Sequence, residues 1–124
     1  MIAITGSPKS GKTTLALRLK GKTKHTDDTI GLGWSDSSEE VSTWFDDTSI
    51  DTIEGTVVPR ALRKWLRKNT FNNKKPVDKI VYLCNSYEHL SKGQETVKKG
   101  TWTIWQQIKP QLLDRGVEIL ESSY

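Results

Sequence analysis

The stretch Gly6-Ser7-Pro8-Lys9-Ser10-Gly11-Lys12-Thr13 decides the fold of this 124-residue chain. It fits the pattern Gly-x-x-x-x-Gly-Lys-Ser/Thr at every fixed position. The apolar residues 1–5 stand before it and are typical of a buried strand. Residues 13–20 follow and are rich in helix formers, with Gly21 as a stop. We therefore predict a buried strand, a glycine loop and a helix, the context in which this pattern is specific.

An anion site follows from the chemistry of this stretch. Backbone N–H groups of a glycine-containing turn bind phosphate oxygens, and the helix N-terminus adds unpaired N–H groups and its dipole. Lys12 would reach the β- and γ-phosphates of a nucleotide, and Thr13 would offer its hydroxyl to Mg²⁺. The alternative is a strand–turn–helix corner without a ligand. The predicted phosphate-binding residues are Gly6, Ser7, Pro8, Lys9, Ser10, Gly11, Lys12, Thr13 and Thr14.

Composition narrows the class of protein. Residues 1–62 carry seven Lys/Arg against nine Asp/Glu, whereas residues 63–124 carry twelve against six. The basic second half points to anionic partners such as nucleotides or nucleic acid, and the alternative is a plain solvated surface. The single cysteine, Cys84, excludes an internal disulfide framework and a cysteine-built zinc site. No stretch approaches the ~20 apolar residues of a membrane span, and no signal-peptide pattern is present, so we expect a cytoplasmic protein without a membrane partner.

Strands and helices alternate along the rest of the chain. Ser37 and Glu40 form a capping-box pattern at the start of a helix over residues 38–45, and residues 86–100 are expected to be a mobile, basic segment. The other predicted elements are strands at 22–26, 49–54, 79–84 and 117–120, and helices at 59–68 and 101–113, the last bent by Pro110. The alternation predicts a single α/β domain over residues 1–124 with a parallel sheet and right-handed crossovers.

Acidic residues stand where two of these strands end. Glu54 closes the strand at 49–54, where ligands gather in open α/β sheets, and we expect it to contact Mg²⁺ through water or to contact substrate. Asp27 and Asp28 follow the strand at 22–26, and either could take the proton from an attacking hydroxyl. The alternatives are a solvated strand-end carboxylate at Glu54 and a polar turn at 27–28.

Taken together, these features resemble the small P-loop kinases, which include nucleoside, shikimate and gluconate kinases, zeta toxins and 5′-hydroxyl polynucleotide kinases. The resemblance rests on the glycine loop, on Asp27-Asp28, on the strand end at 53–55 and on a helix that opens with Arg60. It implies the three-layer P-loop NTPase fold, with a five-stranded parallel sheet in the order 2-3-1-4-5 and helices on both faces. It also implies ATP and Mg²⁺ as the donor, and a hydroxyl or phosphate acceptor.

The resemblance also assigns roles to residues outside the loop. Asp27 or Asp28 matches the family's aspartate after the second strand, and Arg60 and Arg63 match its contacts to the substrate anion. Arginine binds phosphate or carboxylate in a bidentate manner, although a run of charges can equally be a solvated helix face. Trp34, which we place in a glycine loop, could cover a flat substrate such as a nucleobase, or be one exposed aromatic side chain.

Residues 86–100 occupy the position of the family's lid. Gly93 and Gly100 would be its hinges, and the basic side chains that would close over the phosphoryl group are Lys92, Lys98 and Lys99. The alternative is a flexible basic loop. The family's lids usually present arginine, and no arginine lies between Arg67 and Arg115, so Lys9 could take that role. Base recognition would come from the lid, from Tyr124 or from another subunit. We also expect so short a chain to come from a compact genome such as that of a phage.

Three functions are compatible with this sequence. The first is a small kinase that transfers the ATP γ-phosphate to a nucleoside, a nucleotide, a small metabolite or a nucleic-acid 5′ end. The second is a nucleotide-binding regulatory module or weak NTPase that acts through a protein partner without kinase turnover. The third is a nucleic-acid-binding protein whose loop holds backbone phosphates. A homo-oligomer is compatible with each of them.

Overall fold

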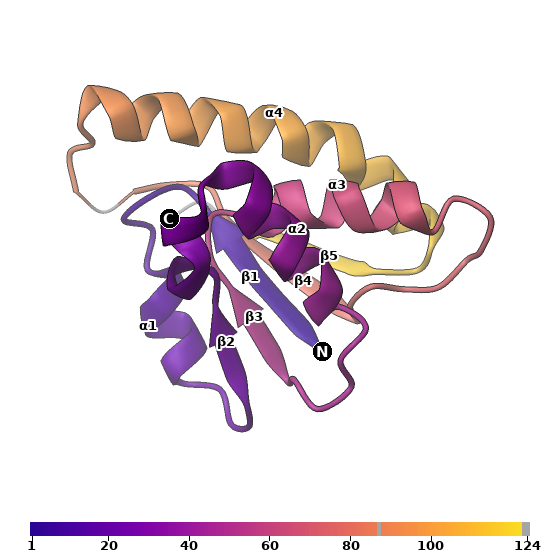
Figure 1. Cartoon of the computed structure of the whole chain (residues 1–124). Helices are drawn as coiled ribbons and strands as arrows, with labels where there is room; N and C mark the ends of the chain where they lie inside the picture. Colours follow the sequence, from indigo (N-terminus) through magenta and orange to yellow (C-terminus); the bar gives the residue numbers. More distant parts are fainter. Residues whose placement is uncertain (87, 123–124) are drawn as a thin grey trace.

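Five parallel strands form one sheet in the order β2-β3-β1-β4-β5 (Figure 1). The computed structural model describes residues 1–86 and 88–122, and Tyr124, expected to stack on a base, lies outside them. The strands are β1 (Ile2–Gly6), β2 (Thr23–His25), β3 (Thr52–Glu54), β4 (Lys79–Leu83) and β5 (Glu118–Ser122). The helices are α1 (Lys12–Leu17), α2 (Trp34–Trp44), α3 (Val58–Lys68) and α4 (Lys92–Asp114), with a 3₁₀ helix η1 (Thr26–Leu32). The predicted α/β class, parallel sheet and strand order are confirmed.

Helices cover the two faces of the sheet unequally. On one face, α2, α3 and α4 enclose the main core, in which Trp105 is fully buried and stacks on Tyr82 with the ring centroids 5.0 Å apart. On the other face lies α1, whose Ala16 packs with Ile4 and Leu83 in a much smaller core. Figure 1 shows α4 lying alongside α3 on the well-covered side. Much of the α1 face of β4 and β5 therefore lacks a covering helix in the described part of the chain.

The carboxyl ends of the strands meet at one edge and bring distant residues side by side. The register pairs Ile4 with Glu54 across β1 and β3, and His25 with Glu54 across β2 and β3. Thr5 of β1 pairs with Tyr82 of β4. The last residues of three strands and the turn after β1 consequently share one region, as expected for a parallel sheet.

The expected start of α2 at residue 38 is wrong. The helix begins one turn earlier, at Trp34, after the N-cap Gly33, and the segment before it is the 3₁₀ helix η1 rather than an open loop. The backbone N–H of Ser37 donates to the Gly33 carbonyl at 2.8 Å, so Ser37 is inside the helix. Its hydroxyl is buried and bonds to that of Thr29 instead of capping an N-terminus. The capping-box pattern at Ser37 and Glu40 is therefore coincidental.

The segment over residues 86–100, which we expect to be a mobile loop, is helical where it overlaps α4. This helix runs without interruption from Lys92 to Asp114, so Gly93 and Gly100 are helical and do not act as hinges between elements. Pro110 lies within the helix and does not end it. A buried stripe holds the helix on the sheet and outweighs the low helix propensity of its glycines: Thr101, Ile104, Trp105, Ile108 and Leu112.

A capping box stabilises the start of α4. The Ser91 hydroxyl accepts from the Gln94 backbone N–H at 3.2 Å, and the Gln94 side chain accepts from the Ser91 N–H at 3.0 Å. We expect Ser91→Ala to lower the free energy of unfolding by about 1 kcal/mol and the melting temperature by about 3–5 °C. Thermal unfolding followed by circular dichroism measures this. Thr103→Ala, in the exposed middle of the same helix, should change the melting temperature little, and equal losses in both variants would contradict a capping role.

Candidate functional site

The glycine loop (residues 6–13) joins β1 to α1 with a backbone that two of its glycines make possible. Gly6 has φ 138°, and a Cβ atom there would lie 2.2 Å from the Leu83 carbonyl oxygen. Gly11 has φ 91° and is the N-cap of α1. Lys9 is a non-glycine residue with φ 54°, a conformation that costs free energy and is concentrated at functional sites. The fixed glycines of the pattern are thus required by geometry.

The segment after β4 holds this loop in place. The Ser7 hydroxyl donates to the Cys84 carbonyl at 2.8 Å, and the Ser86 hydroxyl donates to the Pro8 carbonyl at 2.6 Å. Farther along, Lys9 Nζ lies 3.3 Å from the Glu88 carboxylate. Lys9, expected to act in place of a lid arginine, is therefore engaged with an acidic residue. These contacts order the loop in advance of any ligand, and sequence reasoning did not foresee them.

Lys12 lies inside the curve of its own loop. Its Nζ donates to the Ser7 carbonyl at 2.8 Å. Burial lowers the pKa of the Lys12 ammonium group, while the carboxylates of Glu54 and Asp27 act in the opposite direction. The side chain is therefore a partly desolvated cation, held by a carbonyl that an anion could replace.

Glu54 is the buried acid of the site. Its side chain is 2% exposed, and its Oε1 atom accepts from the Thr13 hydroxyl at 3.2 Å. The same oxygen lies 2.6 Å from Nδ1 of His25. Sequence reasoning missed His25, although the strand order 2-3 and the alternation along β2 would have placed it beside Glu54. The predicted pair of Thr13 and Glu54 does meet.

One cavity brings the predicted residues together. This loop cavity has a volume of 320 Å³ and contains Asp27 of η1 as well as Glu54. Asp28, the other candidate base, does not line it. Thr56 lines it as well, although no sequence pattern pointed to this residue. The full lining is Pro8, Lys9, Ser10, Gly11, Lys12, Thr13, Thr14, Asp27, Glu54 and Thr56. An ion or phosphate in this cavity would meet two lysines, two carboxylates and several hydroxyls.

The two carboxylates of the loop cavity are suited to a metal ion that takes only a few of its ligands from the protein. Among residues 1–86 and 88–122, no group of three or more His, Cys, Asp or Glu side chains could enclose a metal ion. The Thr13 hydroxyl and the buried Glu54 carboxylate are nevertheless adjacent oxygen donors. Mg²⁺ binds to proteins in this way, through one or two side chains together with waters and substrate phosphates. The donor set therefore fits Mg²⁺ bound along with a phosphate ligand.

Two of the predicted substrate contacts meet each other. The Arg60 guanidinium lies 4.6 Å from the centroid of the Trp34 ring, which is 40% exposed at the start of α2. Arg60 also donates to the Thr101 hydroxyl of α4 at 3.4 Å. Burial, and secondarily the nearby Arg63, lower the pKa of Arg60. Neither arginine has an ion pair with an acidic residue in the part of the chain that the structure describes, so the Arg60–Trp34 pair is an open cationic surface.

The other predicted substrate and lid residues do not line the loop cavity. Arg63 Nη1 donates to Gln107 of α4 at 3.3 Å and lines a different cavity of 200 Å³ between α3 and α4. Lys98 lines a cavity of 280 Å³ beside Ser7. Lys92 and Lys99 are exposed on α4 and line neither. Of the three lysines assigned to a lid, one therefore lies next to the glycine loop.

No known protein-family model matches this chain, and no curated protein matches it either. None of the helices in the described residues has both the length and the apolar character needed to span a membrane. A functional interpretation of this chain therefore depends on the geometry of the site itself.

Proposed function

We propose that this chain is a P-loop NTPase-type phosphotransferase that moves the γ-phosphate of ATP to a hydroxyl or phosphate acceptor. The observation that carries the proposal is the loop cavity, where the strained glycine loop, Lys12, Asp27 and Glu54 share one space of 320 Å³. Their arrangement follows the requirements of phosphoryl transfer, which needs a phosphate cradle, a cation on the β- and γ-phosphates and a base for the acceptor.

The donor side would use residues 6–14. Backbone N–H groups of the loop and of the first turn of α1 would bind the phosphates, and Lys12 would exchange the Ser7 carbonyl for phosphate oxygens. Mg²⁺ would be held by the Thr13 hydroxyl and, through water, by Glu54. The ion would neutralise charge on the β- and γ-phosphates. His25 keeps the Glu54 carboxylate oriented through its 2.6 Å contact and is a positioning residue.

The acceptor side would use Asp27. Its carboxylate takes the proton from the acceptor hydroxyl while that oxygen attacks the γ-phosphorus. A new O–P bond forms, the bond between the γ-phosphorus and the β,γ-bridging oxygen breaks, and ADP leaves with the electron pair. The open Arg60–Trp34 surface favours an acceptor that joins a negative charge to a flat ring. A nucleoside monophosphate or a nucleic-acid 5′ end meets that description.

ADP release from MgATP, measured against a panel of acceptors, tests this proposal. The panel contains nucleosides, nucleoside monophosphates, small hydroxy acids and 5′-hydroxyl oligonucleotides. We expect one class to raise ADP release, with nucleotides or oligonucleotides ahead of metabolites. If MgATP binds yet no acceptor raises turnover, the kinase is excluded and the regulatory nucleotide-binding module replaces it. If MgATP does not bind at all, both interpretations fail.

A further inference from the structure

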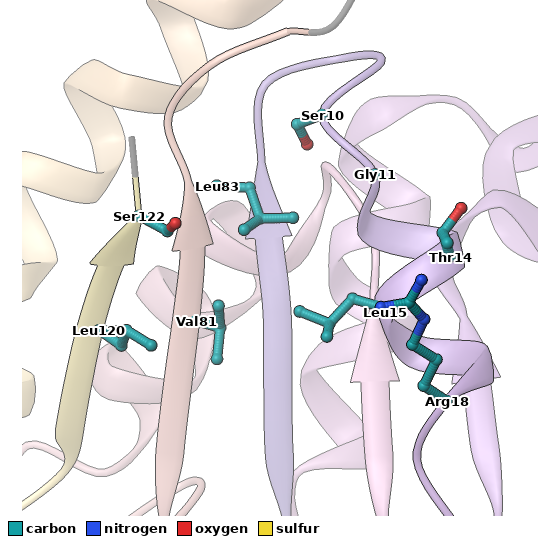
Figure 2. Close-up of a pocket in the computed structure, with 9 residues that line it drawn as sticks. All are labelled: Ser10, Gly11, Thr14, Leu15, Arg18, Val81, Leu83, Leu120 and Ser122. Atoms are coloured by element: carbon teal, nitrogen blue, oxygen red, sulfur yellow. The ribbon is translucent and has the colours of Figure 1, made fainter. Parts of the chain in front are cut away.

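A groove of 520 Å³ lies beside the glycine loop, between α1 and the strands β4 and β5 (Figure 2). Its volume falls within the roughly 300–1,000 Å³ of small-molecule sites. We call it the side groove, and its lining residues come from the glycine loop, from α1 and its C-cap, and from the strands β4 and β5. They are Ser10, Gly11, Thr14, Leu15, Arg18, Val81, Leu83, Leu120 and Ser122.

The floor of the side groove is an apolar platform on two neighbouring strands. The register places Val81 opposite Leu120 and Leu83 opposite Ser122 across β4 and β5. Leu120 is 49% exposed although it is apolar. Because α1 is the helix on this face in the described residues, no other helix there covers the platform. A flat apolar ligand would bury it.

The opposite wall comes from α1. Figure 2 shows Leu15 pointing from the helix toward the strands, with Arg18, the C-cap of the helix, below Thr14. The Arg18 side chain is exposed and makes no hydrogen bond or ion pair within the residues that the structure describes. A guanidinium group without a partner beside an apolar platform is well placed to stack on a ring.

The side groove is continuous with the loop cavity. Three residues line both spaces: Ser10, Gly11 and Thr14. A ligand with its phosphates on the glycine loop can therefore extend past Thr14 into the side groove without leaving the protein surface. The chemistry changes along that path from cations and hydroxyls to leucine and valine, as it does along a nucleotide from phosphate to base.

From this continuity we infer that the side groove is the site for the ribose and base of the donor nucleotide. The inference rests on the proposed function and names the base-binding surface, on the floor of Val81, Leu83 and Leu120. Arg18 would cover the other side of the ring. Ser122 is the one polar side chain that the strands contribute among the described residues. Recognition by shape and stacking, with few hydrogen-bonding groups, should make the site tolerant of the base.

Isothermal titration calorimetry with MgATP, MgGTP and Mg-tripolyphosphate tests the inference on wild type, Leu120→Gln and Arg18→Gln. We expect each substitution to weaken MgATP about tenfold, as the loss of one packing or stacking partner would. Tripolyphosphate, which has no base, should change less than about twofold because it occupies the loop cavity alone. Wild type should bind MgGTP within about threefold of MgATP.

Leu113→Gln is the matched control, because Leu113 is 52% exposed on α4, on the opposite side of the sheet. Unchanged MgATP affinity in Leu120→Gln and Arg18→Gln would overturn the base site while leaving the phosphate site intact. Failure of both MgATP and tripolyphosphate to bind wild type would overturn the proposed function, and this inference with it. A wild-type dimer that Leu120→Gln dissociates, with MgATP affinity unchanged, would show the groove to be a contact between two copies of this chain.

Discussion

Lys12→Met is expected to weaken MgATP binding by at least about 100-fold, because in the proposed function the Lys12 ammonium group would donate charge-assisted hydrogen bonds to the phosphates. The same variant should be as stable as wild type or more stable. Burial lowers the pKa of Lys12, which means that the folded protein holds this cation at a cost in free energy. Methionine fills a similar space without a charge. Calorimetry measures the binding, and urea unfolding measures the stability.

The pH dependence of stability distinguishes the free-energy cost of the buried Lys12 charge from a simple packing effect. Since the pKa of Lys12 in the folded protein is below the 10.5 of an unperturbed lysine, the unfolded chain binds more protons between the two values. The free energy of unfolding of wild type should therefore rise with pH in that window, relative to Lys12→Met. Any stability advantage of the variant should shrink as the pH rises toward 10.5. Lys20→Met, at an exposed position, is the control, and the same trend in it would contradict the explanation.

Much of the sheet was predictable because its signals are local. The apolar residues before Gly6 and the helix formers after Lys12 define the first strand, loop and helix, and the alternation of elements then requires a parallel sheet. The strand predicted at residues 79–84 was recognisable alone, because its residues 80–84 are continuously apolar and include the β-branched Ile80 and Val81. The strand order itself came from the family resemblance and is confirmed in the structure.

The helices were harder to predict, since local patterns compete with tertiary contacts. The spacing Ser-x-x-Glu/Gln occurs at Ser37 and at Ser91, and only the second is a capping box in the described residues. The difference lies in Thr29, whose hydroxyl bonds to that of Ser37 within the folded protein. Glycines 93 and 100 suggested a mobile segment, but the buried stripe that includes Trp105 keeps α4 helical through them.

The site was predictable where it depends on strand ends and unpredictable where it depends on register or groove shape. Glu54 and Asp27 were found because polar residues that end parallel strands meet at one edge. His25 was missed because β2 is short and its composition is weak for a strand. The contact between Trp34 and Arg60 depends on the early start of α2, which no local signal revealed. The side groove arises from the partial cover of one sheet face, a property of the whole fold.

Asp27→Asn should lower kcat by between about 100- and 10,000-fold with the acceptor that the panel identifies. Asparagine keeps the shape of the side chain but cannot take the proton from the acceptor hydroxyl. MgATP affinity should stay the same or tighten by up to about threefold, because the substitution removes a negative charge from the cavity in which we propose that phosphate binds. A fall in kcat without a loss of binding is the expected signature of a base, whereas a residue that only shapes the cavity would change both.

Asp28→Asn is the matched control for this prediction. Asp28 is adjacent in sequence and has the same side chain, but it does not line the loop cavity, so its replacement should change kcat by less than about threefold. A large loss in Asp28→Asn together with full activity in Asp27→Asn would contradict this prediction and identify Asp28 as the base. In that case η1 would have to rearrange when substrate binds. Full activity in both variants would mean that the acceptor reacts without a side-chain base. Because loose transition states of phosphoryl transfer demand little proton abstraction, catalysis would then rest on Lys12, Thr13 and Glu54 alone.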